Sequence, residues 1–133
     1  MLLLKLIQMH SAQYDIKAVV TMEDIEYVQN NYTAVHVSEE IKDYIISIVR
    51  STRNHREVEL GCSPRATLNM MKGSQALAAI RGRDYVIPED IKELATSILS
   101  HRLMLKNELS LGNKSKSIIE EIINTIEAPL EKL

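Results

Sequence analysis

The chain has 133 residues, which is enough for one hydrophobic core and too few for two ordinary domains. A net charge of −2 and a pI near 6.1 argue against a dedicated nucleic-acid binder, which usually carries a strong basic excess. The single cysteine, Cys62, excludes an intrachain disulfide and any multi-cysteine metal site. The four histidines are scattered without metal-ligand helical spacing, so no metal site is predicted.

Residues 1–20 are interpreted separately from the rest. The apolar run from Met1 to His10 has the pattern of the end of an amphipathic helix without a cap. It is too short and interrupted for a membrane span, and it lacks the cleavage site of a secretion signal. We expect residues 1–20 to be the end of a preceding domain with its connecting helix and loop, in a chain cut from something longer. Residues 21–133 then form one domain, and a cytoplasmic setting is expected.

Two amphipathic helices are predicted next. Thr21 and Asp24 have the spacing of a capping box, and an apolar stripe from Met22 to Tyr32 follows them. Ser38 is a suitable cap for a second helix. The apolar positions 41, 44, 45, 48, 49 and 52 of that helix form one unbroken face.

A third predicted helix runs from Pro64 to about Arg81. Ser63 suits the N-cap, Pro64 suits the first helical position, and Gly82 is a natural end. The small residues of positions 73–79 allow a neighbouring helix to approach closely. A fourth helix starts at Pro88 and ends near Arg102, although Ile87 is a poor N-cap on local grounds.

The remaining pattern completes an all-α prediction. Residues 35–37 and 85–87 are β-branched segments that could pair as a minimal bridge, and residues 103–105 and 109–111 are candidates for short extended segments. A last helix is predicted over 115–126, with residues 119, 122, 123 and 126 on one face, and is closed by Pro129. We therefore expect a small bundle of about five to six helices with at most a minimal β-bridge.

Arg65 is the candidate functional residue. It falls in the first turn of its helix, beside the positive end of the helix dipole, where cations are mildly disfavoured. An anion held by the exposed N–H groups and the guanidinium would account for this position. The alternative, which composition alone favours, is a surface arginine paired with Glu59. The sequence has no glycine-rich phosphate loop, so it cannot hydrolyse a nucleotide alone by the P-loop route.

Other basic and sulfur-containing residues have simpler interpretations. Arg81 would complement the end of its helix, and Arg83 would pair with Asp84 or Glu89. The basic residues at positions 50, 53, 55 and 56 are interpreted as a solvated helix end. Cys62 is interpreted as a structural thiol, since no second cysteine or histidine lies nearby in sequence, and residues 70–71 (Met-Met) as core.

The order of these segments resembles a known family. Thr52-Arg53 ends one helix, and the sequence Glu-Leu-Gly-Cys-Ser-Pro-Arg-Ala at 59–66 opens the next. The stretch from Ala76 to Ile91 and the sequence Leu-Ser-His-Arg at 99–102 follow. This order is similar to the C-terminal helical lid of the MoxR-type AAA+ ATPases and covers roughly residues 21–129. Cys62 departs from the family, where Ala is usual, and Ile87 departs where Thr is usual.

The resemblance implies a site and a function. The lid would pack over ATP and Mg²⁺ held by a preceding P-loop domain, which is missing here. Arg65 would be the catalytic sensor 2 arginine that reaches the γ-phosphate, with Ser63 as its helix cap and Pro64 as the rigid first-turn residue. The chain alone is expected to be inactive and to bind no cofactor tightly.

The resemblance also implies partners. These are the chain's own P-loop domain, neighbouring subunits of a ring (commonly a hexamer) and an unknown client in a chaperone-like or complex-maturation role. No membrane is implied, and the roles of Arg53, Arg81 and Arg83 stay open.

Two other interpretations are binding modules without ATP chemistry. Residues 79–94 also resemble the end of a histone-fold unit, which would dimerise and contact DNA. The acidic pI and the lack of a lysine-rich face count against it. The other interpretation is a helical domain that docks onto a partner protein.

Overall fold

The computed structural model describes residues 16–107 and 114–130, and the predictions for residues 1–15 and 109–111 lie outside them. The described residues form the helices α2 (Met22–Asn31), α3 (Glu39–Asn54), α4 (Pro64–Ile80), α5 (Pro88–Leu99) and α6 (Lys114–Thr125). Single 3-10 turns span Tyr32–Ala34 and Ser100–Arg102, and the strands are β1 (Val58–Leu60) and β2 (Met104–Leu105). The predicted mostly helical fold is confirmed. The domain boundary at residue 20 stays a prediction.

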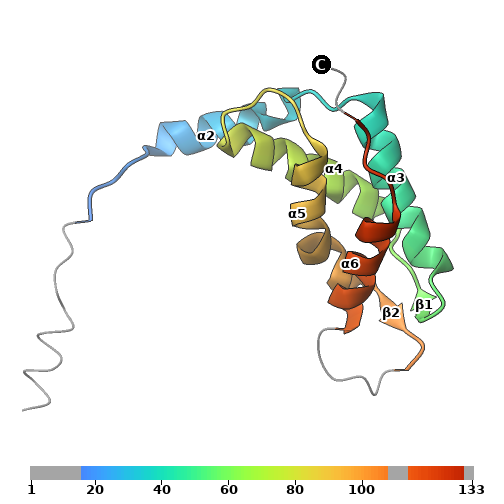
Figure 1. The fold of residues 1–133 in the computed structure, drawn as a ribbon. Helices are drawn as coiled ribbons and strands as arrows, with labels where there is room; N and C mark the ends of the chain where they lie inside the picture. Colours follow the sequence, from blue (N-terminus) through green and yellow to red (C-terminus); the bar gives the residue numbers. More distant parts are fainter. Residues whose placement is uncertain (1–15, 108–113, 131–133) are drawn as a thin grey trace, which may run out of the picture.

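Helices α3, α4, α5 and α6 pack together into the body of the molecule (Figure 1). Helix α4 contacts both α3 and α5, and α6 contacts the same two helices. The predicted apolar face of α3 is buried at all six of its positions. In α6 the buried residues are Ile118, Ile119 and Ile122, while Ile123 and Ile126 are only partly buried.

Helix α2 lies to one side of this body (Figure 1). Its predicted capping box is present, because the Asp24 amide donates to Thr21 Oγ1 at 3.1 Å and the Thr21 amide donates to Asp24 Oδ2 at 2.8 Å. None of its residues is buried, however, and Met22, Ile25 and Val28 expose much of their apolar surface. The apolar stripe therefore indicates a helix, but none of its residues belongs to the buried core that the structure describes.

The small residues of α4 bring α5 close, as predicted. A Cβ atom on Gly73 would lie 2.9 Å from Ile98 Cδ1. On another side of α4, buried Gln75 donates from Nε2 to the carbonyl oxygens of Thr33 (3.0 Å) and Val35 (2.8 Å). Just beyond the C-cap of α4, Gly82 has a φ of 73°, a left-handed conformation that glycine adopts without strain.

The β-structure is small. The predicted bridge is present between His36 and Tyr85: His36 N–H donates to Asp84 O at 2.8 Å, and Val86 N–H donates to His36 O at 3.0 Å. Strand β2 lies within the predicted segment 103–105 and pairs antiparallel with β1, which the sequence analysis did not predict. The three residues of β1, Val-Glu-Leu, are too few for their alternation to reveal such a strand.

The start of α5 is built around Asp90, which is fully buried. The Arg83 guanidinium donates to Asp90 Oδ2 at 2.8 Å and to Oδ1 at 2.6 Å, and Arg81 lies 3.5 Å from Oδ1. The Ile87 amide donates to Oδ2 at 3.0 Å, which compensates for the poor cap at that position. Arg81 also pairs with Glu93. The structure thus gives both arginines structural roles, with a partner that the sequence analysis had not named.

Burial by itself raises the pKa of Asp90. The hydrogen bonds from Arg83 and from the Ile87 amide, together with the charges of Arg83 and Arg81, outweigh it and hold the pKa below its usual value. The ionised form is therefore the one that the fold stabilises.

We expect Asp90→Ala to lower the free energy of unfolding by roughly 3 kcal/mol, because it leaves a partly buried arginine and a backbone amide without their acceptor. Urea denaturation followed by circular dichroism measures this loss. Glu93→Ala is the matched control, since the exposed pair that it removes is worth at most about 1 kcal/mol. Equal losses for the two variants would contradict this account.

The same carboxylate predicts a pH dependence. A folded-state pKa below the unfolded value of about 3.8 makes the contribution of Asp90 complete above that pH, and it is lost as pH falls through the folded pKa. We expect the stability difference between wild type and Asp90→Asn to be constant from pH 7 to about 5 and to shrink toward pH 3. A difference that grows in acid would contradict the sign.

Candidate functional site

The candidate site is the start of α4. Ser63 has the extended backbone of an N-cap residue (φ −75°, ψ 165°) and Pro64 is the first helical residue, as predicted. The expected side-chain cap is absent, however: the Ser63 hydroxyl makes no capping bond, and the amide of Ala66 donates to the Ser63 carbonyl oxygen at 2.9 Å instead. The hydroxyl therefore stays available beside the first turn.

Arg65 is exposed and makes no hydrogen bond or ion pair with any residue that the structure describes. The pairing with Glu59 that composition favoured is not formed. The first turn of α4 contains no acidic residue, whereas α2, α3 and α5 each begin with two. The positive end of the α4 dipole and the Arg65 guanidinium are therefore not neutralised by the described part of the chain.

Cys62 joins the start of α4 to two other helices. Its amide donates to Thr52 Oγ1 of α3 at 2.9 Å, and its carbonyl oxygen accepts from Arg53 Nε, also of α3, at 3.0 Å. Its thiol lies 3.6 Å from the carbonyl oxygen of Leu99, the last residue of α5. The three residues before Arg65 are thus anchored at Cys62, a role that the sequence analysis did not foresee.

The interpretation of Cys62 as a structural thiol is confirmed by its burial, with 1% of its surface exposed. Burial raises the pKa of this thiol, and the Thr52 hydrogen bond and the charges of Arg102 and Arg53 offset the shift only in part. A buried thiol with a raised pKa is a poor nucleophile, so Cys62 holds the site in place and takes no chemical part in it.

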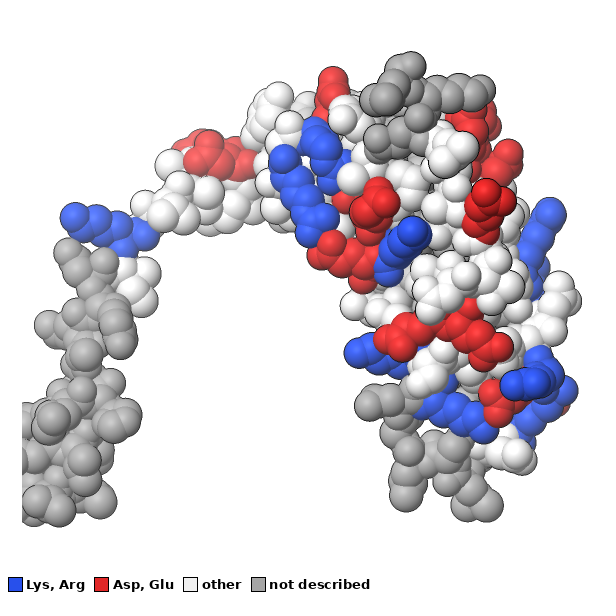
Figure 2. Space-filling view, in the orientation of Figure 1, with Lys and Arg blue, Asp and Glu red and all other residues white. Residues whose placement is uncertain are grey.

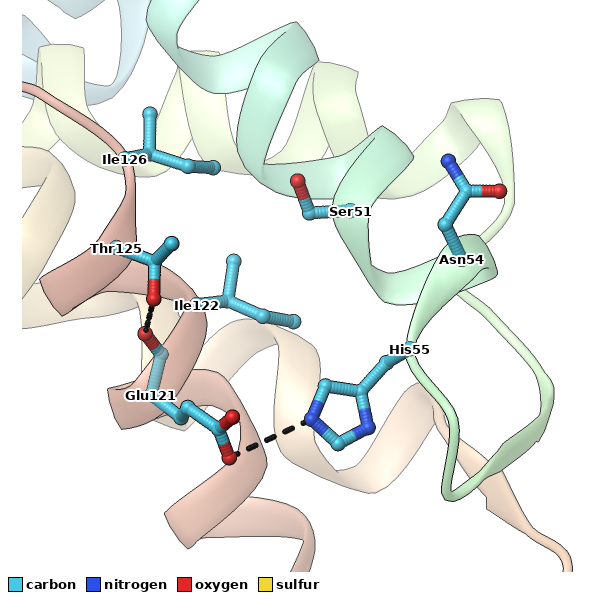
Figure 3. A pocket seen from close by; sticks show the side chains of 7 residues that line it. All are labelled: Ser51, Asn54, His55, Glu121, Ile122, Thr125 and Ile126. Carbon is cyan, nitrogen blue, oxygen red and sulfur yellow. Dashed lines mark hydrogen bonds and ion pairs between the residues drawn. The ribbon is translucent and has the colours of Figure 1, made fainter.

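A concavity of about 260 Å³ lies between α3 and α6 (Figure 3). In it His55 Nε2 is 3.5 Å from Glu121 Oε2, and His55 Nδ1 accepts from the Glu57 amide at 3.2 Å. Its lining residues are Ser51, Asn54, His55, Glu121, Ile122, Thr125 and Ile126. The Glu121 carboxylate and the lack of an arginine or lysine in this lining make the groove a poor place for an anion.

The charge on the face shown in Figure 2 gives no support to a nucleic-acid interface there. On the face shown in Figure 2, lysine and arginine side chains alternate with aspartate and glutamate, and no extended basic surface forms. Among the described residues, no group of three or more His, Cys, Asp or Glu side chains could hold a metal ion. No helix in the described ranges has both the length and the apolarity that a membrane crossing requires.

Comparison with known proteins identifies the family of the chain. Residues 50–122 match the AAA lid domain family. The chain is 39% identical over 118 residues to the uncharacterized protein YeaC of Bacillus subtilis, covering 88% of this chain and 37% of YeaC. It is 33% identical over 114 residues to the chaperone MoxR1 of Mycobacterium tuberculosis, covering 78% of this chain and 29% of MoxR1.

The fold has a counterpart among solved structures. A crystal structure titled as a "putative ATPase" from Cytophaga hutchinsonii superposes with a TM-score of 0.79 and 31% identity, over 96% of this chain and 42% of that one. The chain spans less than two fifths of the two curated relatives named above. It belongs to the AAA lid domain family and is a lid of the MoxR type.

We expect the Cys62 thiol to be protected from a thiol reagent such as DTNB at pH 8 and to react about a hundredfold faster in urea, because its thiolate is disfavoured and its sulfur is covered. Since the chain has one cysteine, the absorbance change reports on this residue alone. Native labelling as fast as that of the unfolded chain would show that the loop before α4 is open.

Proposed function

We propose that this lid closes over ATP bound to a P-loop domain, and that Arg65 is the sensor 2 arginine that contacts the γ-phosphate. The observation that carries the proposal is the exposed Arg65 guanidinium, which has no hydrogen bond or ion pair with a described residue and lies beside a helix start that has no acidic residue. A terminal phosphate would supply the negative charge that this position lacks. The similarity to MoxR proteins supports the same assignment.

The residues present fit an anionic oxygen. An arginine guanidinium offers parallel N–H donors that match phosphate geometry. In the first turn of α4 Pro64 has no N–H and the Ala66 amide is bonded to the Ser63 carbonyl oxygen, so the backbone amide of Arg65 is the donor that remains for an anion there. Pro64 fixes the backbone at the helix start, so the position of Arg65 relative to that end is well defined. Ser63 adds a hydroxyl without a capping bond. No acidic residue in the first turn opposes the anion.

The chemical role of Arg65 follows from charge. When the bond to the γ-phosphoryl group breaks, negative charge spreads over the phosphoryl and leaving oxygens, and a fixed guanidinium stabilises that distribution. The P-loop domain would hold ATP and its Mg²⁺. A water molecule would accept the phosphoryl group as the bond to the leaving oxygen breaks, and the lid would contribute Arg65 and exclude bulk water.

The same contact would couple chemistry to motion. Helices α3, α4 and α5 are tied at Cys62, so a force on Arg65 is transmitted to the whole lid. We propose that the lid moves as one body as ATP is hydrolysed and that it contacts the neighbouring subunit of a ring, most simply a hexamer. Its role would be chaperone-like, as for the chaperone MoxR1, and would act on a client of undefined identity.

We expect Arg65→Ala to lower ATP turnover about a hundredfold or more, measured in the polypeptide that joins this lid to its P-loop domain. The melting temperature should change little, because Arg65 is exposed and makes no contact within the described lid. Lys72→Ala is the matched control, since Lys72 is an exposed cation two turns further along α4. Wild-type turnover in Arg65→Ala would overturn the proposed function.

A further inference from the structure

We propose that Arg53 is a positioning residue for Arg65: it fixes the turn from which α4 begins and so determines where the Arg65 guanidinium lies. The inference rests on the proposed function of Arg65. It adds a second arginine, from a different helix, that acts on the reaction through the protein backbone.

Consecutive residues of α3 hold both backbone polar groups of Cys62. Thr52 Oγ1 accepts from the amide at 2.9 Å, and Arg53 Nε donates to the carbonyl oxygen at 3.0 Å. The amide belongs to the peptide plane that precedes Cys62, and the carbonyl belongs to the plane that leads into Ser63. Because a peptide unit is planar, two such bonds fix the orientation of both planes. The bond from Arg53 is therefore the one that fixes the Cys62–Ser63 peptide plane, which leads to the N-cap of α4.

The loop also packs directly on the backbone of Arg53. A Cβ atom added to Gly61 would lie 2.7 Å from Arg53 N, Cα and Cγ, a distance that real Cβ atoms essentially never show. Glycine is therefore needed at position 61 for the chain to come close enough for the Arg53 bond. This contact is independent of the hydrogen bonds and indicates the same fixed placement of the turn on α3.

The two anchors differ in burial, which separates their roles. Thr52 is fully buried, and its hydroxyl also donates to the Val49 carbonyl oxygen at 2.6 Å, so it is part of the core. Arg53 is exposed and its bond to the Cys62 carbonyl oxygen is only partly buried, so we expect its loss to cost less global stability than loss of the buried Thr52 bond. Arg65 is only three residues beyond Cys62, and a rotation of the Cys62–Ser63 plane moves it directly. Loss of the Arg53 bond should thus affect the placement of Arg65 more than folding.

The test compares three variants in the polypeptide that joins this lid to its P-loop domain. Arg53→Met keeps most of the side-chain stem and removes the donor, Arg53→Lys keeps a donor, and Arg50→Met removes an exposed arginine one turn earlier on α3. We expect Arg53→Met to lower the kcat of ATP hydrolysis about tenfold or more with a much smaller change in KM, since small misplacements of a reacting group are costly. Arg53→Lys should recover part of the loss, and Arg50→Met should behave as wild type.

A double-mutant cycle separates positioning from direct phosphate contact. If Arg53 acts through Arg65, adding Arg53→Met to Arg65→Ala causes no further loss of kcat. An equal further loss in the double variant would show independent action and overturn the inference. Full turnover in Arg53→Met, in a protein where Arg65→Ala is impaired, would overturn the inference alone. Full turnover in Arg65→Ala would instead overturn the proposed function on which it rests.

Hydrogen exchange on the 133-residue chain gives a readout that needs no ATP. We expect the Cys62 amide to exchange about tenfold faster in Arg53→Met than in wild type, because the turn opens more often, while the amide of Ile45 in the core is unchanged. Unchanged exchange at Cys62 would show that Arg53 does not hold the turn.

Discussion

The anchoring of Cys62 is the constraint on which the rest of this lid depends. The loop before α4 enters the interior, so its backbone polar groups need partners there. The Cys62 amide and carbonyl find them in the side chains of Thr52 and Arg53, and the thiol reaches α5 at Leu99. One residue thus fixes the start of α4 against the end of α3 and the end of α5. These three helices can then respond to a ligand at α4 as one unit.

A second consequence concerns which arginine is left for a ligand. Arg81 and Arg83 are paired with the buried Asp90, and Arg102 donates to the Ile98 carbonyl oxygen at 2.9 Å. Arg53 is held by Cys62. Arg65 has no such partner among the described residues and sits at a helix start without acids. Arg50 and Arg56 are exposed as well, but neither lies in the first turn of a helix. Arg65 stands at the positive end of a helix dipole without acids, and this placement is what favours an anion at α4.

Features that depend on local rules could be predicted from the sequence, and those that depend on distant contacts could not. The buried face of α3 follows from a helical period sustained over 16 residues, and the Thr21 capping box follows from spacing alone. Strand β1 needs partners 44 and 47 residues away (Leu60 with Met104, Val58 with Leu105), and Arg53 and Asp90 find their partners through folding. Arg65 breaks a local electrostatic preference, but the prediction of a site at Ser63, Pro64 and Arg65 rests on the resemblance of the surrounding sequence to the MoxR-type lid. Their role in catalysis stays a prediction.

The magnitudes explain why a fold can keep an arginine in this position. A cation in the first turn of an exposed helix costs about 0.3–1 kcal/mol, which is small against the 5–15 kcal/mol by which domains are stable. A fixed donor to charge that develops in a transition state contributes about 3–4 kcal/mol. The first quantity is a small cost to folding, and the second is a reduction of the activation barrier in the proposed reaction. A fold can therefore keep the arginine at little cost to stability. An acid in place of Arg65 would improve the isolated helix and remove the guanidinium that favours a phosphate there.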